Sequence, residues 1–294
     1  APVNDLGIGT FSGKIQALLM RRNYDEDGDA SSGTLAETLN YRSPDLGPLS
    51  LGLQFIHASR LFDGGSYGVL DGGHPNGHDW TIYNSDFNVL NELYAEINFE
   101  FAGLENTALT VGRKVADYPF AAPCPIRQKP QALEAVVLSS SDVPGLQIDV
   151  GHIEKFSSWS TRDDGSSALY AASFHDIEDV IADFEASSCG LNRRIPDPDT
   201  KGMQFVSAST DILPRTRLGL YDLYGENLYN TLGSTVDIAL LENDALSLTW
   251  KNHFIMQQDV GDFPADINVQ TIESALALSK GALTLQPGVM SVFG

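Results

Sequence analysis

The segment Asn91–Phe101 reads NELYAEINFEF, and its pattern decides the fold class of this chain. Every second residue is apolar, namely Leu93, Ala95, Ile97, Phe99 and Phe101. A period of two indicates a β-strand with one apolar and one polar face. A soluble sheet packs such an apolar face on a core, whereas a membrane β-barrel turns it toward lipid. About ten residues is also the length that a tilted membrane-spanning strand needs.

The composition narrows the class of protein without choosing between these two folds. The chain has 294 residues, enough for one large all-β domain, and its hydrophobic content of 42% suits either fold. The formal net charge of −21 argues against nucleic acid as a partner, and it suits either a solvated surface or a pore that favours cations. No apolar run reaches the length of about 18 residues that a transmembrane helix requires.

The links between the strand-like segments alternate in length along the chain. Short links are expected at 43–48, 102–106 and 139–145, and long links near 24–33, 62–90, 117–131, 157–201, 225–232 and 257–271. In an up-and-down meander, successive links lie at opposite ends of the strands. Tight turns at one end and long loops at the other are typical of outer-membrane barrels, whereas soluble sandwiches contain Greek-key crossovers. The sequence therefore predicts one all-β domain over 1–294, a transmembrane up-and-down antiparallel β-barrel.

Thirteen or fourteen strands are readable, and the last of them covers 282–293. Single-chain bacterial barrels have an even number of strands. Either one strand escapes the pattern, or the chain stops before the barrel closes. Pro287 and Gly288 interrupt the last strand and argue for an edge or a turn, which favours the second interpretation, that C-terminal strands are missing.

Several motifs in the centre of the chain carry a family resemblance. They are Asn91-Glu92-Leu93-Tyr94, Leu109-Thr110-Val111-Gly112-Arg113, Glu134-Ala135 and Val143-Pro144-Gly145-Leu146. Together they resemble the outer membrane porin D family of substrate-specific porins, specifically over 91–155 and more loosely over 10–290. The resemblance implies a barrel of about 16–18 strands in a complete chain and passive uptake of small solutes. It also implies an inward-folded constriction loop at 117–131, and 157–201 is then a long external loop.

The acidic face of the opening segment supplies the first candidates for the pore wall. If the chain is a barrel, the alternation directs Glu92, Glu96 and Glu100 into the lumen. A row of carboxylates between low-dielectric walls attracts cations. The alternative is that these carboxylates only solvate the lumen.

The basic candidates follow from the resemblance. It assigns the cationic side of a constriction to Arg113, Arg127 and Lys129, with Asp117 at the start of the loop. Opposed charges across a constriction orient dipolar solutes, and the alternative is charge pairs that only fix the loop. Strict alternation points Arg113 toward lipid, so a bulge or the strand end must turn it inward.

The loops contain cysteines and acidic segments whose roles stay open. Cys124 and Cys189 are the two cysteines of the chain, and in an exported protein they either form a disulfide or remain free thiols. The acidic segments 25–29 and 163–165 resemble calcium loops but lack the twelve-residue ligand pattern. A metal site at His74 and His78 lacks enough ligands. No cofactor or metal is expected.

These patterns point to a channel and not to an enzyme, because no nucleophile elbow, phosphate loop or dinucleotide fingerprint is present. The first hypothesis is an outer-membrane porin for passive diffusion of ions, amino acids and small carboxylates, embedded in outer-membrane lipid as a homotrimer. The second is a structural barrel that sheathes a partner such as an electron-carrying multihaem protein. The third is a soluble, secreted β-sheet binding protein.

Overall fold

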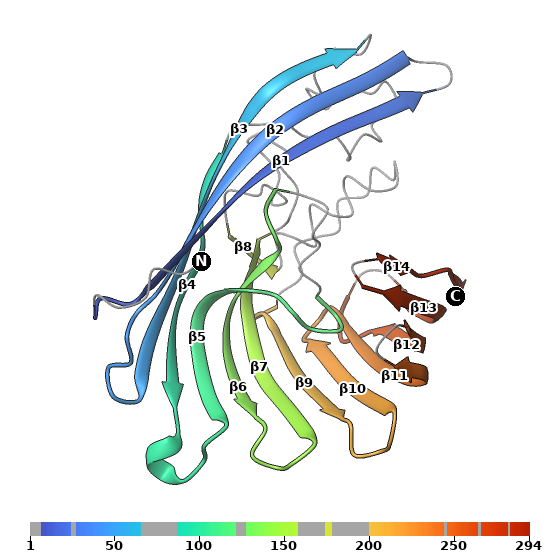
Figure 1. The fold of residues 1–294 in the computed structure, drawn as a ribbon. Helices are drawn as coiled ribbons and strands as arrows, with labels where there is room; N and C mark the ends of the chain where they lie inside the picture. Colours follow the sequence, from blue (N-terminus) through green and yellow to red (C-terminus); the bar gives the residue numbers. More distant parts are fainter. Residues whose placement is uncertain are drawn as a thin grey trace. The chain divides into compact units, whose positions relative to one another are not determined.

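The computed structural model describes residues 7–24, 28–65, 87–121, 128–157, 174–177, 200–243, 246–263, 266–281 and 283–294. Its strands are β1 (Thr10–Tyr24), β2 (Gly28–Arg42), β3 (Leu49–Gly65), β4 (Phe87–Asn98), β5 (Thr107–Val115), β6 (Ala132–Ser140), β7 (Leu146–Ser157), β8 (His175–Asp176), β9 (Met203–Thr210), β10 (Thr216–Gly225), β11 (Tyr229–Asn243), β12 (Leu246–Asp259), β13 (Asn268–Lys280), β14 (Leu283–Leu285) and β15 (Gly288–Phe293). The strands lie in sequence order in one sheet, with β8 paired to β7 and both β14 and β15 paired to β13 (Figure 1). Within these residues, no helix is long and apolar enough to cross a membrane.

The chain divides into two compact units. The first comprises residues 1–97, 110–136 and 153–197, and the second comprises residues 98–109, 137–152 and 198–294. Strands β4, β5, β6 and β7 therefore contribute residues to both units.

Many large apolar side chains of each unit lie on the exposed face of its sheet. In the first unit, Leu39 and Leu93 are 49% and 51% exposed, whereas the polar residues Ser50 and Asn91 are fully buried on the opposite face. In the second unit, Leu220 is 62% exposed, whereas its neighbour Tyr221 is 2% exposed. A soluble sheet buries its apolar face, so this inverted arrangement identifies the exposed face as lipid-facing and the polar face as lumen-facing.

The lumen-facing side of β2, β3 and β4 combines a polar row with an apolar cluster. Gln54 Nε2 donates to Asn40 Oδ1 at 2.8 Å, and Asn91 Nδ2 donates to Gln54 Oε1 at 2.9 Å, so three amides join the strands. Asn91 is the extra residue of a bulge, since Gln54 pairs with Glu92 and Phe55 pairs with Leu90. The bulge changes the alternation, and beyond it the buried lumen-facing residues are an apolar cluster of Ala36, Ile56, Ala58, Phe87 and Val89.

The first predicted loop, at 24–33, is wrong. Strands β1 and β2 remain paired from Thr10↔Arg42 to Tyr24↔Gly28, which leaves only 25–27 between them. Backbone pairing in a hairpin does not require an apolar face, so the strands continue past the point where the hydrophobic pattern ends. The predicted long link at 225–232 is wrong for the same reason, because β10 ends at Gly225 and β11 begins at Tyr229. Tight turns therefore occur at both ends of the strands.

The predicted interruption of the last strand at Pro287 is confirmed. The predicted last strand is split into β14 and β15, both of which pair with β13. Pro287 lies between the two pieces, and its carbonyl accepts a hydrogen bond from Leu276 N at 3.0 Å. A proline lacks the N–H that a continuous strand would need at this position.

Substituting Leu93 with arginine tests the assignment of the two faces. A charge on the lipid-facing side costs about 2–4 kcal/mol near the bilayer midplane, so the variant should unfold in bilayers at lower urea concentration than the parent. The matched control is Ser12→Arg, because Ser12 accepts a hydrogen bond from the lumen-facing Asn40. Equal destabilisation by both substitutions would contradict the assignment.

Candidate functional site

The predicted constriction loop leaves and re-enters the sheet at one point. Ala116 N, just after β5, donates to Gln131 O, just before β6, at 3.1 Å. Asp117 is exposed at the start of the loop, and a tight turn at Tyr118–Ala121 follows it. Arg127 and Cys124 lie outside the described residues, as does Cys189, so the candidate disulfide and one predicted pore residue are not placed.

The returning end of the loop contacts the lumen-facing side of β2. Gln128 Nε2 donates to the carbonyl oxygen of Thr34 at 3.1 Å and also to Thr34 Oγ1, and both residues are buried. Thr34 lies on the same face of β2 as Ala36 of the apolar cluster. Strands β3, β4 and β5 separate β2 from β6 in the sheet. The loop therefore reaches across the lumen-facing side instead of projecting away from it.

Lys129 anchors this loop from a buried position. Its side chain is fully buried, and its Nζ donates to the carbonyl oxygens of Pro130 and Ser157 at 3.1 and 3.3 Å. Burial lowers the pKa of the Lys129 amine to about 7. The structure thus places Lys129 inside the packed base of the loop, and its amine is not presented to solvent as the predicted cationic side requires.

The Arg113 side chain turns toward the lumen after a change of backbone conformation at Gly112. Gly112 has a φ of +122°, a conformation that interrupts the regular alternation of β5. Arg113 Nε donates to Glu134 Oε2 at 2.7 Å, and its guanidinium lies 4.3 Å from the centre of the Phe174 ring. Phe174 packs against the apolar cluster, so Arg113 lies on the lumen-facing side.

The three predicted acidic residues have different environments. Glu92 Oε1 accepts a hydrogen bond from Val115 N at 3.0 Å and so ties β4 to the end of β5. Glu96 is part of an ion-pair cluster. Glu100 is not on a strand, because β4 ends at Asn98 and residues Glu100–Ala102 form a 3₁₀ turn. Its prediction as a strand residue is therefore wrong.

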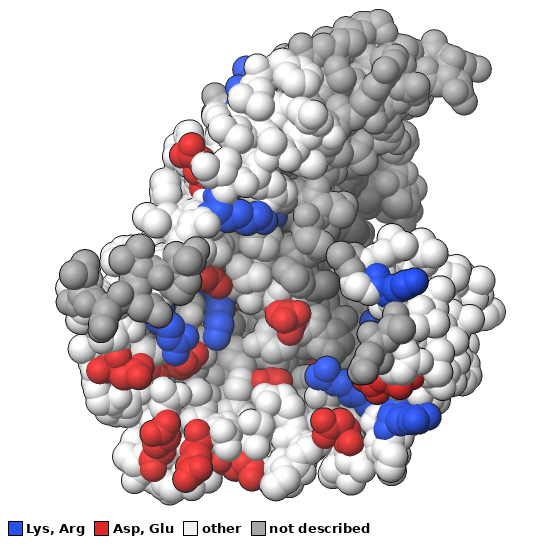
Figure 2. Space-filling model, viewed as in Figure 1, with Lys and Arg blue, Asp and Glu red and all other residues white. Residues whose placement is uncertain are grey.

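The ion-pair cluster joins three strands through Glu96. Arg42 of β2 contacts Glu96 Oε1 at 2.6 Å, and Lys114 of β5 lies 3.5 Å from Glu96 Oε2. The Lys114 ammonium also lies 4.8 Å from the centre of the Tyr94 ring. The Arg42 and Lys114 side chains remain 47% and 45% exposed, whereas that of Glu96 is 14% exposed. Figure 2 shows basic and acidic side chains next to one another on the face in view.

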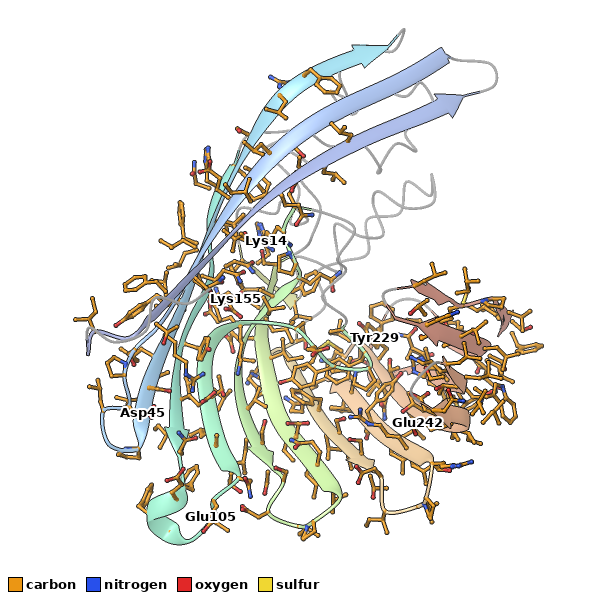
Figure 3. The ribbon with its side chains drawn as sticks, viewed as in Figure 1. Lys14, Asp45, Glu105, Lys155, Tyr229 and Glu242 are labelled. Atoms are coloured by element: carbon orange, nitrogen blue, oxygen red, sulfur yellow. The ribbon has the colours of Figure 1, made fainter. Side chains whose placement is uncertain are left out.

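We call Arg42, Glu96, Arg113, Lys114 and Glu134 the charged wall. Sequence reasoning proposed Glu96 and Arg113 but missed Arg42 and Glu134 as their partners. The sequence pattern could have placed Arg42 on the polar face, because it alternates with the apolar Leu39 and Tyr41 at the end of β2. A further ion pair joins Lys155 of β7 (Figure 3) to Asp176 of β8 at 3.0 Å.

The remaining predicted loop sites cannot be placed. The calcium-like segment 163–165 and the histidines at 74 and 78 lie outside the described residues, as does most of 25–29 and of the external loop 157–201. The described residues contain no group of three or more His, Cys, Asp or Glu side chains that could hold a metal ion.

Comparison with known proteins identifies the fold. No protein-family model matches the chain, and no curated protein sequence is detectably similar. Solved structures do match. OpdK from Pseudomonas aeruginosa, with vanillate, has a TM-score of 0.69 and 16% identity over 97% of this chain and 67% of that one. OccK9 (OpdG) from the same organism has a TM-score of 0.70 and 16% identity, over 97% and 68%. A BenF-like porin from Pseudomonas fluorescens Pf-5 has a TM-score of 0.68 and 14% identity, over 97% and 67%.

These matches confirm the predicted fold, a transmembrane antiparallel β-barrel of the outer-membrane porin type. The likeness to the porin D family seen in the sequence is therefore confirmed at the level of the fold. The chain spans about two thirds of the length of these porins.

Proposed function

We propose that this protein is an outer-membrane porin through which small polar or charged solutes diffuse passively. The observation that carries the proposal is the charged wall on the lumen-facing side of a transmembrane β-barrel. Two of its three cations, Arg42 and Lys114, stay about half exposed although they contact Glu96. Charges held on a low-dielectric wall focus their field into the lumen and act on passing solutes.

The proposal extends to the constriction and to the solute class. Gln128 and Lys129 hold the loop 117–131 against lumen-facing groups, which supports a role of this loop in narrowing the pore, with Arg127 and Asp117 as its charged residues. Small carboxylates are the first solutes to test. Similar porins have been solved with vanillate and in complex with glucuronate, both of which carry a carboxylate. The Arg42 and Lys114 side chains offer this chain cationic partners for such a group.

Reconstitution in planar lipid bilayers tests the function. The purified, folded protein should give discrete conductance steps. Absence of conductance from a folded preparation would overturn the proposal, and a protein partner that co-purifies and fills the lumen would favour the sheath hypothesis instead. The mass of the protein–detergent complex tests the predicted homotrimer, and a monomeric mass would reject it.

Substituting Glu96 with glutamine should shift the channel toward anions. The change removes the carboxylate shared by Arg42 and Lys114 while both cations remain exposed to the lumen. The reversal potential in a potassium chloride gradient should move toward the chloride value. The control is Glu105→Gln in the tight turn after η1 (Figure 3), which should leave the reversal potential unchanged. A shift toward cations in the Glu96 variant would contradict the role of the charged wall.

A further inference from the structure

The second unit carries a separate recess on its lumen-facing side. It has a volume of about 380 Å³, in the range of small-molecule sites, and Thr235, Asp237, Lys251, His253, Glu273 and Met290 are among its lining residues. The alternation along the strands assigns the recess to the lumen-facing side. Phe254 and Ile272 are large, exposed apolar residues and therefore face lipid. Their sequence neighbours His253 and Glu273 then face the lumen.

His253 is held in a defined orientation within this recess. Its Nε2 lies 2.8 Å from Tyr221 Oη, the two rings meet edge to face, and Glu273 Oε2 lies 3.7 Å from Nδ1. Tyr221 reaches β12 by crossing β11 above Gly233. A Cβ at Gly233 would lie 2.1 Å from the Tyr221 ring, so only glycine leaves room for this crossing.

The recess places charges of both signs in adjacent rows of the sheet. One row is formed by Thr235, His253 and Glu273, which pair across β11, β12 and β13. The next row on the same face contains Asp237 and Lys251, which are direct cross-strand partners. Lys251 and Glu273 are therefore diagonal neighbours, and such positions lie about 7–8 Å apart. A small solute between them can contact a cation and an anion at once.

We propose that this recess is a binding subsite for small zwitterions of the α-amino acid type. The solute carboxylate binds the Lys251 ammonium, and the solute ammonium binds the Glu273 carboxylate, with Asp237 on the other side of Lys251. Thr235 and His253 offer hydrogen bonds to the same polar groups. The proposal rests on the porin function and names one solute class for it.

Equilibrium dialysis of the detergent-solubilised protein against isotopically labelled L-alanine tests the subsite. Propionate and ethylammonium are the matched probes, because each keeps one of the two charges on a skeleton of similar size. L-alanine should bind more tightly than either. Lys251→Met and Glu273→Gln should each weaken L-alanine binding by about tenfold, since each removes one charge-assisted contact. Tyr221→Phe should weaken it less, because Tyr221 only positions His253.

The controls separate this inference from the porin function. Glu242→Gln (Figure 3) and Lys280→Met remove charges at the ends of β11 and β13 and should not change binding. Normal conductance without L-alanine binding would overturn the subsite alone, whereas loss of conductance in the folded parent protein would overturn the porin function. Propionate binding as tight as that of L-alanine, sensitive only to Lys251, would show a simple anion site and reject the zwitterion proposal.

Discussion

Replacing Gly112 with alanine is expected to destabilise the barrel by about 3 kcal/mol or more. Two independent costs add at this position. Gly112 has a φ of +122°, which a residue with a side chain rarely adopts, and a Cβ there would lie 2.3 Å from the carbonyl oxygen of Leu93. The obstructing atom belongs to the backbone of β4, so it cannot move aside as a flexible side chain would. Relief of the clash requires β5 to separate from β4 next to Arg113.

Urea unfolding monitored by near-ultraviolet circular dichroism measures this loss of stability. The matched control is Gly47→Ala, because Gly47 also has a positive φ of +69° but no described atom within 4 Å of its Cβ position. The control isolates the backbone strain, which is of the order of 1 kcal/mol. Equal costs for the two variants would show that the contact with Leu93 is unimportant. The Gly112 variant should also lose the Arg113 ion pair with Glu134, visible as altered channel selectivity.

The sequence predicted the fold because lipid imposes a strict alternation on the membrane-spanning part of each strand. Leu93, Ala95 and Ile97 alternate with Glu92, Tyr94 and Glu96 as expected, and the strand order follows from the pattern of links. The alternation does not mark where a strand ends. Phe99 and Phe101 continue the apolar period into the turn, where their rings lie 5.8 Å apart. Gly103, with a φ of +80°, was the local sign that the strand had already ended.

The site was harder to predict because its contacts join distant parts of the chain. Glu96 meets Arg42, which lies 54 positions earlier, and Gln128 meets Thr34, 94 positions away. A period of two assigns each residue to a face but does not say which strands are neighbours or where a bulge reverses the alternation. The bulge at Asn91 and the positive φ of Gly112 determine which residues reach the lumen. The bulge at Asn91 becomes visible only in the register between β3 and β4.

The stability of the folded protein is expected to rise with pH above 7 because of Lys129. Burial lowers the pKa of its amine to about 7 in the folded state, whereas an unfolded chain has the ordinary value of 10.5. Between these two values the unfolded state binds one more proton than the folded state, so the free energy of unfolding increases with pH. Below pH 7 both states are protonated and this contribution is constant. Over the whole interval the gain is at most about 5 kcal/mol.

Urea unfolding at a series of pH values from 7 upward measures this dependence. Lys129→Met keeps a side chain of similar length without a titratable group, so its stability should not show the rise. The control Lys14→Met on β1 (Figure 3) removes an exposed lysine, so this variant should still show the rise in stability with pH. A parent protein whose stability stays flat above pH 7 would show that Lys129 remains charged when folded. In that case the base of the constriction loop must open to water, and Lys129 would return to the pore as the cation that the family resemblance predicts.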